Sequence, residues 1–234
     1  MRPIYVETLI DAPVEQVWWA TQVPGEHRRW DVRFDRIDPM PGGEPARFRY
    51  ATTVFPGLTV RGWGVHAGQR DRWDGTRTSA LRFGSDDRRS LIAAGSGYWR
   101  YLPGPHGVRF LTGYSYTPRW GRLGRLADLA FRPLFGWATA WSFDRLRLWL
   151  TRGVPPERAR ANAFGELVLR VVGVGTATVA AGAAGPVAGA AAFAVTALVA
   201  GVLPPHPDTP AARRCRRRPP DRLAAWAPHL VERR

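Results

Sequence analysis

The sequence predicts an α+β domain, in which an antiparallel sheet is closed by one long helix, followed by a membrane segment. Three patterns support this prediction. After Trp30, and as far as residue 117, apolar and polar residues alternate as they do in strands with one buried face. Between Gly121 and Arg152 the spacing of apolar residues becomes helical. From Val171 to Leu203 the chain has no charged residue. This stretch is longer than the roughly 20 apolar residues that a spanning helix needs.

The individual elements follow from local signals. Residues 3–10 read as a strand, and Asp11 is the expected N-cap of a helix that begins near Pro13. A short second helix is expected around residues 26–29. Turns rich in Pro, Gly and Asp indicate a meander of further strands, at residues 31–39, 45–54, 58–67, 76–84, 90–102 and 107–117. Pro133 is expected to kink or interrupt the long helix.

Composition limits the chemistry that the chain can carry. The 234 residues have a formal charge of +15, and every basic residue is Arg. Cys215 is the only cysteine, which rules out an intramolecular disulfide and a multi-thiolate metal site and fits a reducing compartment. The first 20 residues contain Glu7, Asp11 and Glu15 and no apolar core, so they are not a secretory signal. We expect no metal, no cofactor and a cytoplasmic N-terminal domain.

The uncharged C-terminal segment has three interpretations: a single span, a helical hairpin that turns at Gly185-Pro186, or a soluble Ala/Gly-rich stretch. Arginines precede and follow the segment, and positive charge on both sides favours a hairpin whose two ends lie on the cytoplasmic side. The predicted organisation is therefore a domain at 1–152, a linker at 153–165, a hydrophobic membrane segment at 166–203 and a basic Pro/Arg-rich tail at 204–234, in a protein of the cell membrane.

The tail contains the cluster of arginines from Arg213 to Arg218. A basic cluster next to a membrane segment is expected to contact anionic membrane lipids. Aromatic and basic residues do not interleave there as they do in nucleic-acid recognition, so nucleic acid is not an expected partner.

Short stretches of residues 3–152 carry a family resemblance. The run from Ile10 to Trp18 reads IDAPVEQVW, Trp30-Asp31 follows it, and residues 97–101 read GYWRY. With this order of elements, the chain resembles the START-like, polyketide cyclase-dehydrase (SRPBCC) superfamily. The resemblance implies a helix-grip fold, a curved antiparallel sheet around a long C-terminal helix, with a ligand cavity between them. It transfers no catalytic residue, because its members share no motif for one.

Alternation along the strands selects candidates for the lining of that cavity. On residues 107–117 one face carries Phe110, Thr112, Tyr114 and Tyr116, and on residues 90–102 Trp99 and Tyr101 share a face opposite to that of Tyr98. The predicted ligand-binding residues are Tyr98, Trp99, Tyr101, Phe110, Thr112, Tyr114, Tyr116, Trp137, Trp141 and His66. An aromatic lining of this kind suits an apolar ligand such as a lipid, an isoprenoid or a polyketide.

Two functions remain open at this point. The first is a carrier or sensor of a hydrophobic molecule near the membrane, which needs only an apolar cavity. The second is a cyclase or dehydratase acting on a bound ketone, which needs an internal acid or base, for which His66, Tyr98, Tyr114 and Asp144 are the candidates. The carboxylates of Asp31, Asp35 and Asp38 are expected on an exposed, salt-bridged strand face.

Overall fold

The structure is a computed structural model that describes residues 3–42 and 44–225. Seven strands form one antiparallel sheet in the order β1-β7-β6-β5-β4-β3-β2. The strands are β1 (Ile4–Ile10), β2 (Arg36–Met40), β3 (Arg47–Phe55), β4 (Leu58–Asp71), β5 (Arg77–Gly84), β6 (Ile92–Gly104) and β7 (Gly107–Pro118). The predicted meander is confirmed, and β1 extends the sheet by pairing with the last strand, β7.

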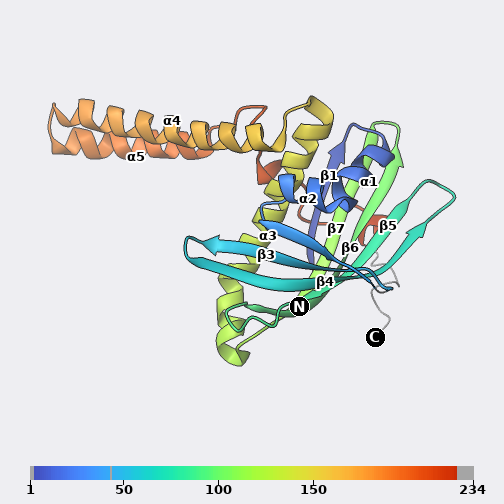
Figure 1. Ribbon diagram of the computed structural model, residues 1–234. Helices are drawn as coiled ribbons and strands as arrows, with labels where there is room; N and C mark the ends of the chain where they lie inside the picture. Colours follow the sequence, from blue (N-terminus) through green and yellow to red (C-terminus); the bar gives the residue numbers. More distant parts are fainter. Residues whose placement is uncertain (1–2, 43, 226–234) are drawn as a thin grey trace. The chain divides into compact units, whose positions relative to one another are not determined.

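Six helices and one 3-10 turn complete the described chain. They are α1 (Val14–Gln22), α2 (Pro24–Trp30), α3 (Gly121–Arg152), α4 (Pro156–Gly182), α5 (Pro186–Val202), η1 (Ala212–Arg214) and α6 (Arg222–Ala225). The sheet curves strongly, and α3 runs along one of its faces (Figure 1). The predicted helix-grip arrangement is therefore present, with α3 as the gripped helix.

The chain divides into two compact units. The sheet unit contains residues up to Gly153 and the segment from Ala211 onward, and the hairpin unit contains Val154–Pro210. The stretch predicted as a linker, 153–165, is helical from Pro156 onward, where α4 begins and where Pro is favoured at the first helical positions.

The basic tail also differs from the prediction of a separate segment. The backbone of Arg216 pairs with that of Glu7 in a short antiparallel bridge, with N···O distances of 3.0 and 2.8 Å. The side chains of Ala212 and Cys215 are buried in the core of the sheet unit. Residues 211–225 are therefore part of the same fold as β1 and α3.

Two local expectations are also corrected. The N-cap of α1 is Pro13 rather than Asp11, and no side chain caps this helix; the backbone N–H of Asp11 instead donates to Thr151 Oγ1 at 3.1 Å. Pro133 lies inside α3 and does not interrupt it, because the helix continues from Gly121 to Arg152.

Candidate functional site

The face of the sheet that contacts α3 is the one predicted from strand alternation. On β7, Phe110 stacks on Phe143 of α3 with ring centroids 4.5 Å apart, and the Tyr114 hydroxyl lies 2.7 Å from Thr139 Oγ1. The Tyr116 hydroxyl donates to Asp128 Oδ1 at 2.5 Å. Burial, the largest effect, and the hydrogen bond to Asp128 raise the pKa of Tyr116 above its ordinary value.

Part of this face is closed core. Tyr101, Phe110 and Phe143 have no exposed surface. The Tyr101 hydroxyl is also satisfied internally, by Thr21 Oγ1 at 2.6 Å and by Gln22 Nε2 at 2.9 Å. These side chains fill the space between the sheet and the C-terminal half of α3, so they support a site without being free to touch a ligand.

Tyr98 lies on the opposite face of the sheet. Its side chain packs with Tyr5, Leu111 and Ala224, away from α3. Successive side chains of a strand point to opposite faces, so Tyr98 cannot share a lining with Trp99 and Tyr101, and we leave it out of the site.

Of the predicted pair on α3, Trp137 lies on the outer face, whereas Trp141 is partly buried and packs against the core of the sheet unit. Trp137 is 49% exposed, and the two rings stack with centroids 6.3 Å apart. Phe131 and Phe135 are the residues of this half of α3 that face the sheet. The helix is apolar on both faces, and periodicity alone does not tell which of them is buried.

The outer face carries a stripe of large exposed side chains at helical spacing. Leu123, Leu126, Leu134 and Trp137 are between 49% and 67% exposed. Arg122 and Arg125 are exposed beside them. Large exposed apolar patches on a soluble surface mark contact sites for proteins or membranes.

A buried polar centre that the sequence did not reveal lies between the sheet and α3. Asp31 has no exposed surface, and its carboxylate accepts hydrogen bonds from Arg33 Nε at 2.9 Å and Arg33 Nη2 at 2.6 Å. His27 Nε2 lies 3.1 Å from the same carboxylate, and Ser142 of α3 donates to it at 3.3 Å. The prediction that Asp31 is exposed on a strand is wrong, because α2 ends at Trp30 and turns Asp31 inward.

Aromatic rings enclose this polar centre. The Arg33 guanidinium lies over the rings of Phe34, Tyr114 and Phe135 at 5.5, 5.8 and 5.5 Å. The His27 ring stacks on Trp30 and meets the ring of Trp99 edge-on at 4.9 Å. The i,i+4 spacing of His27 and Asp31 was the one signal in the sequence that could have indicated the pair.

Burial and charge set the ionisation of this centre. Burial alone would raise the pKa of Asp31, but the Arg33 charge and the hydrogen bonds from His27 and Arg33 outweigh it, so that the pKa lies well below the ordinary 3.8. Burial alone would lower the pKa of Arg33, and the Asp31 carboxylate raises it above its ordinary value instead. The centre therefore holds a permanent ion pair in an apolar surrounding. A guanidinium has five N–H donors, of which the Asp31 side chain takes two.

The remaining part of the same face, on β3 to β5, is half-buried and aromatic. Phe48 and Tyr50 stand directly opposite Gly64 and Gly62 on the next strand, and their rings lie over these glycines so closely that an added Cβ would come within 3.0 Å. Phe83 lies over Gly95 of β6 in the same way. These three rings form an apolar surface beside the polar centre. We call this surface the aromatic floor (Phe48, Tyr50 and Phe83).

His66 of β4 lies beside Phe48, a ring of the aromatic floor. Its ring centroid lies 6.0 Å from that of Phe48, and it pairs across the strands with Leu81. Burial lowers the pKa of His66 below its ordinary 6.5 and so favours the neutral imidazole, in which one ring nitrogen donates a hydrogen bond and the other accepts one.

Asp144, the other acid–base candidate, is structural. It is fully buried, and it accepts hydrogen bonds from Arg147 Nε at 2.6 Å, Arg214 Nη1 at 3.0 Å and the Ala211 backbone N–H at 2.7 Å. Its partners hold the returning tail against α3. Within residues 3–42 and 44–225, no three His, Cys, Asp or Glu side chains are grouped as metal ligands.

The arginines at the start of the tail are partly used within the sheet unit. Arg214 pairs with Asp144 at 3.0 Å, and Arg216 pairs with Glu7 at 3.6 Å. The cluster from Arg213 to Arg218 is therefore not available as a whole to a lipid surface.

Comparison with known proteins supports the fold. The crystal structure of TTHA0849 from Thermus thermophilus matches 64% of this chain and 98% of its own, with a TM-score of 0.50 and 16% identity. The di-domain ARO/CYC StfQ from the steffimycin biosynthetic pathway matches 64% of this chain and 50% of its own, with a TM-score of 0.50 and 12% identity. The sheet unit therefore has the START-like, SRPBCC-type fold that the sequence predicted.

One curated relative covers more of the sequence. The chain is 45% identical over 167 residues, 70% of its length, to the uncharacterized membrane protein YndG of Bacillus subtilis (strain 168). The chain spans 62% of the length of that relative. No family model matches the chain. In the described part, the helix Pro156–Gly182 is long and apolar enough to cross a membrane, and Pro186–Val202 is a shorter apolar helix.

Proposed function

We propose that the protein binds a hydrophobic small molecule on the aromatic floor, with a polar group of that molecule directed to Arg33 and His66. The observation that carries this proposal is the Arg33–Asp31 pair, which is placed between the sheet and α3 and enclosed by aromatic rings. Lining of this kind, mostly aromatic with a few oriented polar groups, is typical of small-molecule sites. A guanidinium held by a carboxylate keeps its orientation and can donate to a carbonyl or hydroxyl oxygen.

The ligand class follows from the same surface. A flat or extended apolar body, such as a lipid, an isoprenoid or a polyketide chain, would cover the rings of Phe48, Tyr50 and Phe83. The ion pair is already neutral as a whole, so a single oxygen-bearing end group suits it better than a second charge. A non-catalytic carrier or sensor is the simplest function for this arrangement.

The membrane part of the proposal concerns the hairpin unit. We propose that α4 and α5 attach the protein to the cell membrane, with the sheet unit in the cytoplasm. The absence of charge between Val171 and Leu203, the exposed apolar stripe on α3 and the membrane-protein relative all support this. Attachment would place the aromatic floor close to a source of apolar ligand.

The ligand proposal is tested by native mass spectrometry of the full chain in detergent, followed by solvent extraction. We expect a discrete mass that leaves when the protein unfolds. The variant Leu81→Trp adds bulk beside His66 on the site face and should lose that ligand. The matched control Arg82→Trp places the same ring on the opposite face of β5 and should retain the ligand. Equal ligand content in both variants would refute the location of the site.

His27 favours a second candidate function, a cyclase. A histidine beside a buried carboxylate is oriented as a general base, here with rings around it that suit a polyketide. It would take a proton from the carbon between two carbonyls of a bound chain. The resulting carbanion would form a carbon–carbon bond to a third carbonyl carbon and so close a ring, and the alkoxide left on that carbonyl oxygen would take the proton back from His27. His27→Gln should then abolish ring formation from a poly-β-ketone substrate, followed by its absorbance, while ligand retention stays unchanged. Retained ring formation would exclude this role.

A further inference from the structure

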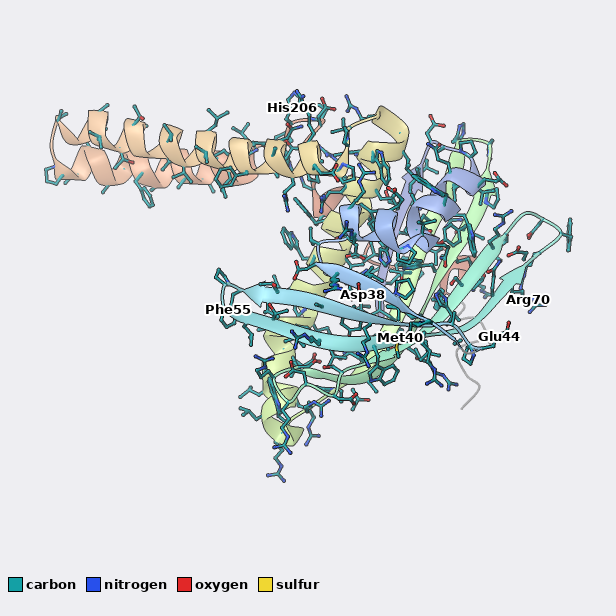
Figure 2. The ribbon with its side chains drawn as sticks, in the orientation of Figure 1. Asp38, Met40, Glu44, Phe55, Arg70 and His206 are labelled. Atoms are coloured by element: carbon teal, nitrogen blue, oxygen red, sulfur yellow. The ribbon has the colours of Figure 1, made fainter. Side chains whose placement is uncertain are left out.

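The hairpin unit has a polar base. Arg170 of α4 pairs with Glu166, and its guanidinium donates to the backbone carbonyls of Leu203 and Pro204 at 3.1 and 3.2 Å. Glu166 also accepts the backbone N–H of His206 at 3.1 Å, and His206 lies at this base (Figure 2). Arg170 also donates to the carbonyl of Ala200 in the last turn of α5, so that it satisfies one of the carbonyls that a helix end otherwise leaves open.

Beyond this base the hairpin is uncharged, and the hydroxyls of Thr178 and Thr196 are satisfied within their own helices. The helices α4 and α5 lie side by side (Figure 1) and approach closely where Gly189 meets Gly182. The hydroxyls of Thr178 and Thr196 donate to carbonyls one turn earlier in their own helices, at 2.7 and 2.6 Å. Polar groups in hydrocarbon must be satisfied in this way.

The turn between the helices is also suited to hydrocarbon. The N–H groups of Ala184 and Gly185 donate to the carbonyls of Ala181 and Gly182, both at 3.0 Å, and Pro186 has no N–H group. The turn from Gly182 to Pro186 carries no charged and no aromatic residue. Segments that emerge at a membrane surface usually carry Trp, Tyr, Lys or Arg there.

The uncharged part of each hairpin helix is shorter than the hydrocarbon core of a bilayer is thick. From Val171 to Gly182 the rise of an α-helix amounts to about 18 Å, and the 17 residues of α5 amount to about 26 Å. The hydrocarbon core of a typical bilayer is about 30 Å thick. With the polar base held at one surface, the turn stops inside the hydrocarbon.

The course of the chain fixes the side on which both ends lie. Residues before and after the hairpin belong to the same sheet unit, and they are joined by the Glu7–Arg216 bridge and by the Asp144–Ala211 hydrogen bond. A single span would put Gly153 and Ala211 on opposite sides of the membrane and would separate these partners.

We infer that α4 and α5 form a re-entrant hairpin, which enters the bilayer from the side of the sheet unit and turns back inside the hydrocarbon without reaching the other surface. Its partner is the acyl region of the lipid bilayer. The inference rests on the membrane attachment proposed above and adds the depth and the topology.

The test is cysteine accessibility in the full chain, in sealed right-side-out and inverted membrane vesicles, with a membrane-impermeant maleimide. The natural Cys215 is a silent background, because burial, the largest effect, raises the pKa of its thiol to about 12. One variant, Ala184→Cys, reports on the turn. The matched variant, Ala161→Cys, reports on an exposed position of α4 before the polar base.

We expect Ala161→Cys to be labelled only from the side of the sheet unit, and Ala184→Cys from neither side until detergent dissolves the vesicles. Labelling of Ala184→Cys from the opposite side would show a full crossing and overturn the inference. Labelling of both variants at equal rates from one side would show a hairpin that lies outside the bilayer. Release of the wild-type chain by alkaline carbonate would instead refute the proposed attachment, and protection of Ala184→Cys in released, dimeric protein would assign the apolar surface to a second copy.

Discussion

The carboxylate of Asp31 receives hydrogen bonds from Arg33, His27 and Ser142 while having no exposed surface of its own. Burying an unpaired carboxylate would cost several kcal/mol, and pairing with Arg33 offsets that cost. At the scale of single residues, this pair explains how a charged group remains between an aromatic floor and a helix. It also makes the polar centre sensitive to the loss of either partner.

Replacement of Asp31 by Asn should destabilise the protein by about 3–5 kcal/mol at pH 7, because Arg33 would be left buried without its counter-charge. Denaturant unfolding of the full chain in detergent measures the free energy of unfolding. The matched control is Asp38→Asn, which breaks the exposed pair with Arg36 and should change it by less than about 1 kcal/mol. Equal effects would show that the Asp31 pair is no more than a surface interaction.

The same carboxylate predicts a pH dependence. Because the pKa of Asp31 is lowered on folding from 3.8, the unfolded state binds the proton more readily, and the stabilisation is complete above about pH 4 and decreases as the pH falls below it. The wild-type protein should therefore lose more stability between pH 5 and pH 2 than Asp31→Asn does. Parallel curves for the two proteins would contradict the assignment.

At the scale of elements, aromatic rings placed over cross-strand glycines recur through the sheet. Besides the rings of the aromatic floor, Trp63 lies over Gly84 and Tyr98 over Gly113 on the other face. Glycine weakens a strand because it has no side chain to pack, and a ring from the neighbouring strand restores the missing contact. On the site face this arrangement places the three rings of the aromatic floor over Gly64, Gly62 and Gly95.

The variant Gly64→Ala should destabilise the protein by about 1–3 kcal/mol, because the new methyl group would displace the Phe48 ring, and it should also weaken ligand retention. The double variant Phe48→Ala/Gly64→Ala should recover part of the loss caused by the methyl group, which a double-mutant cycle measures. The control Gly25→Ala has open space around the new methyl group and should be neutral. Strict additivity at Phe48 and Gly64 would contradict the contact.

At the scale of the whole molecule, the hairpin unit is inserted into the sheet unit rather than appended to it. The Sγ of Cys215 donates to the Ala140 carbonyl of α3 at 3.2 Å, and Arg100 donates to the carbonyl of Leu223. The tail therefore contributes to both faces of the sheet unit. Removal of the tail would expose the core residues of the sheet unit that the tail covers.

Truncation after Pro210 should destabilise the sheet unit by at least about 3 kcal/mol, through the loss of buried side chains and of two partners of Asp144, the Ala211 N–H and the Arg214 guanidinium. Limited proteolysis and thermal unfolding of the full and the truncated chains measure the difference. Equal resistance would show that the returning segment adds nothing to the fold.

Periodicity in the sequence was sufficient to predict the strands and the helix from Gly121 to Arg152, since each is a run of residues with a clear repeat of apolar positions. Strand alternation also placed Phe110, Thr112, Tyr114 and Tyr116 on one face, with Tyr98 opposite to Trp99. The uncharged run from Val171 to Leu203 and the Gly185-Pro186 turn predicted the two helices of the hairpin.

Tertiary contacts decided the rest. Both faces of α3 are apolar, so only packing against the sheet shows that Phe135 is inside and Trp137 outside. Asp31 became internal because Arg33 and His27 are close enough to stabilise its charge, which a period-two pattern does not express. The return of Arg216 to Glu7 joins residues about 200 positions apart, and such long-range pairs leave no local pattern, because their stability comes from surfaces that exist only after folding.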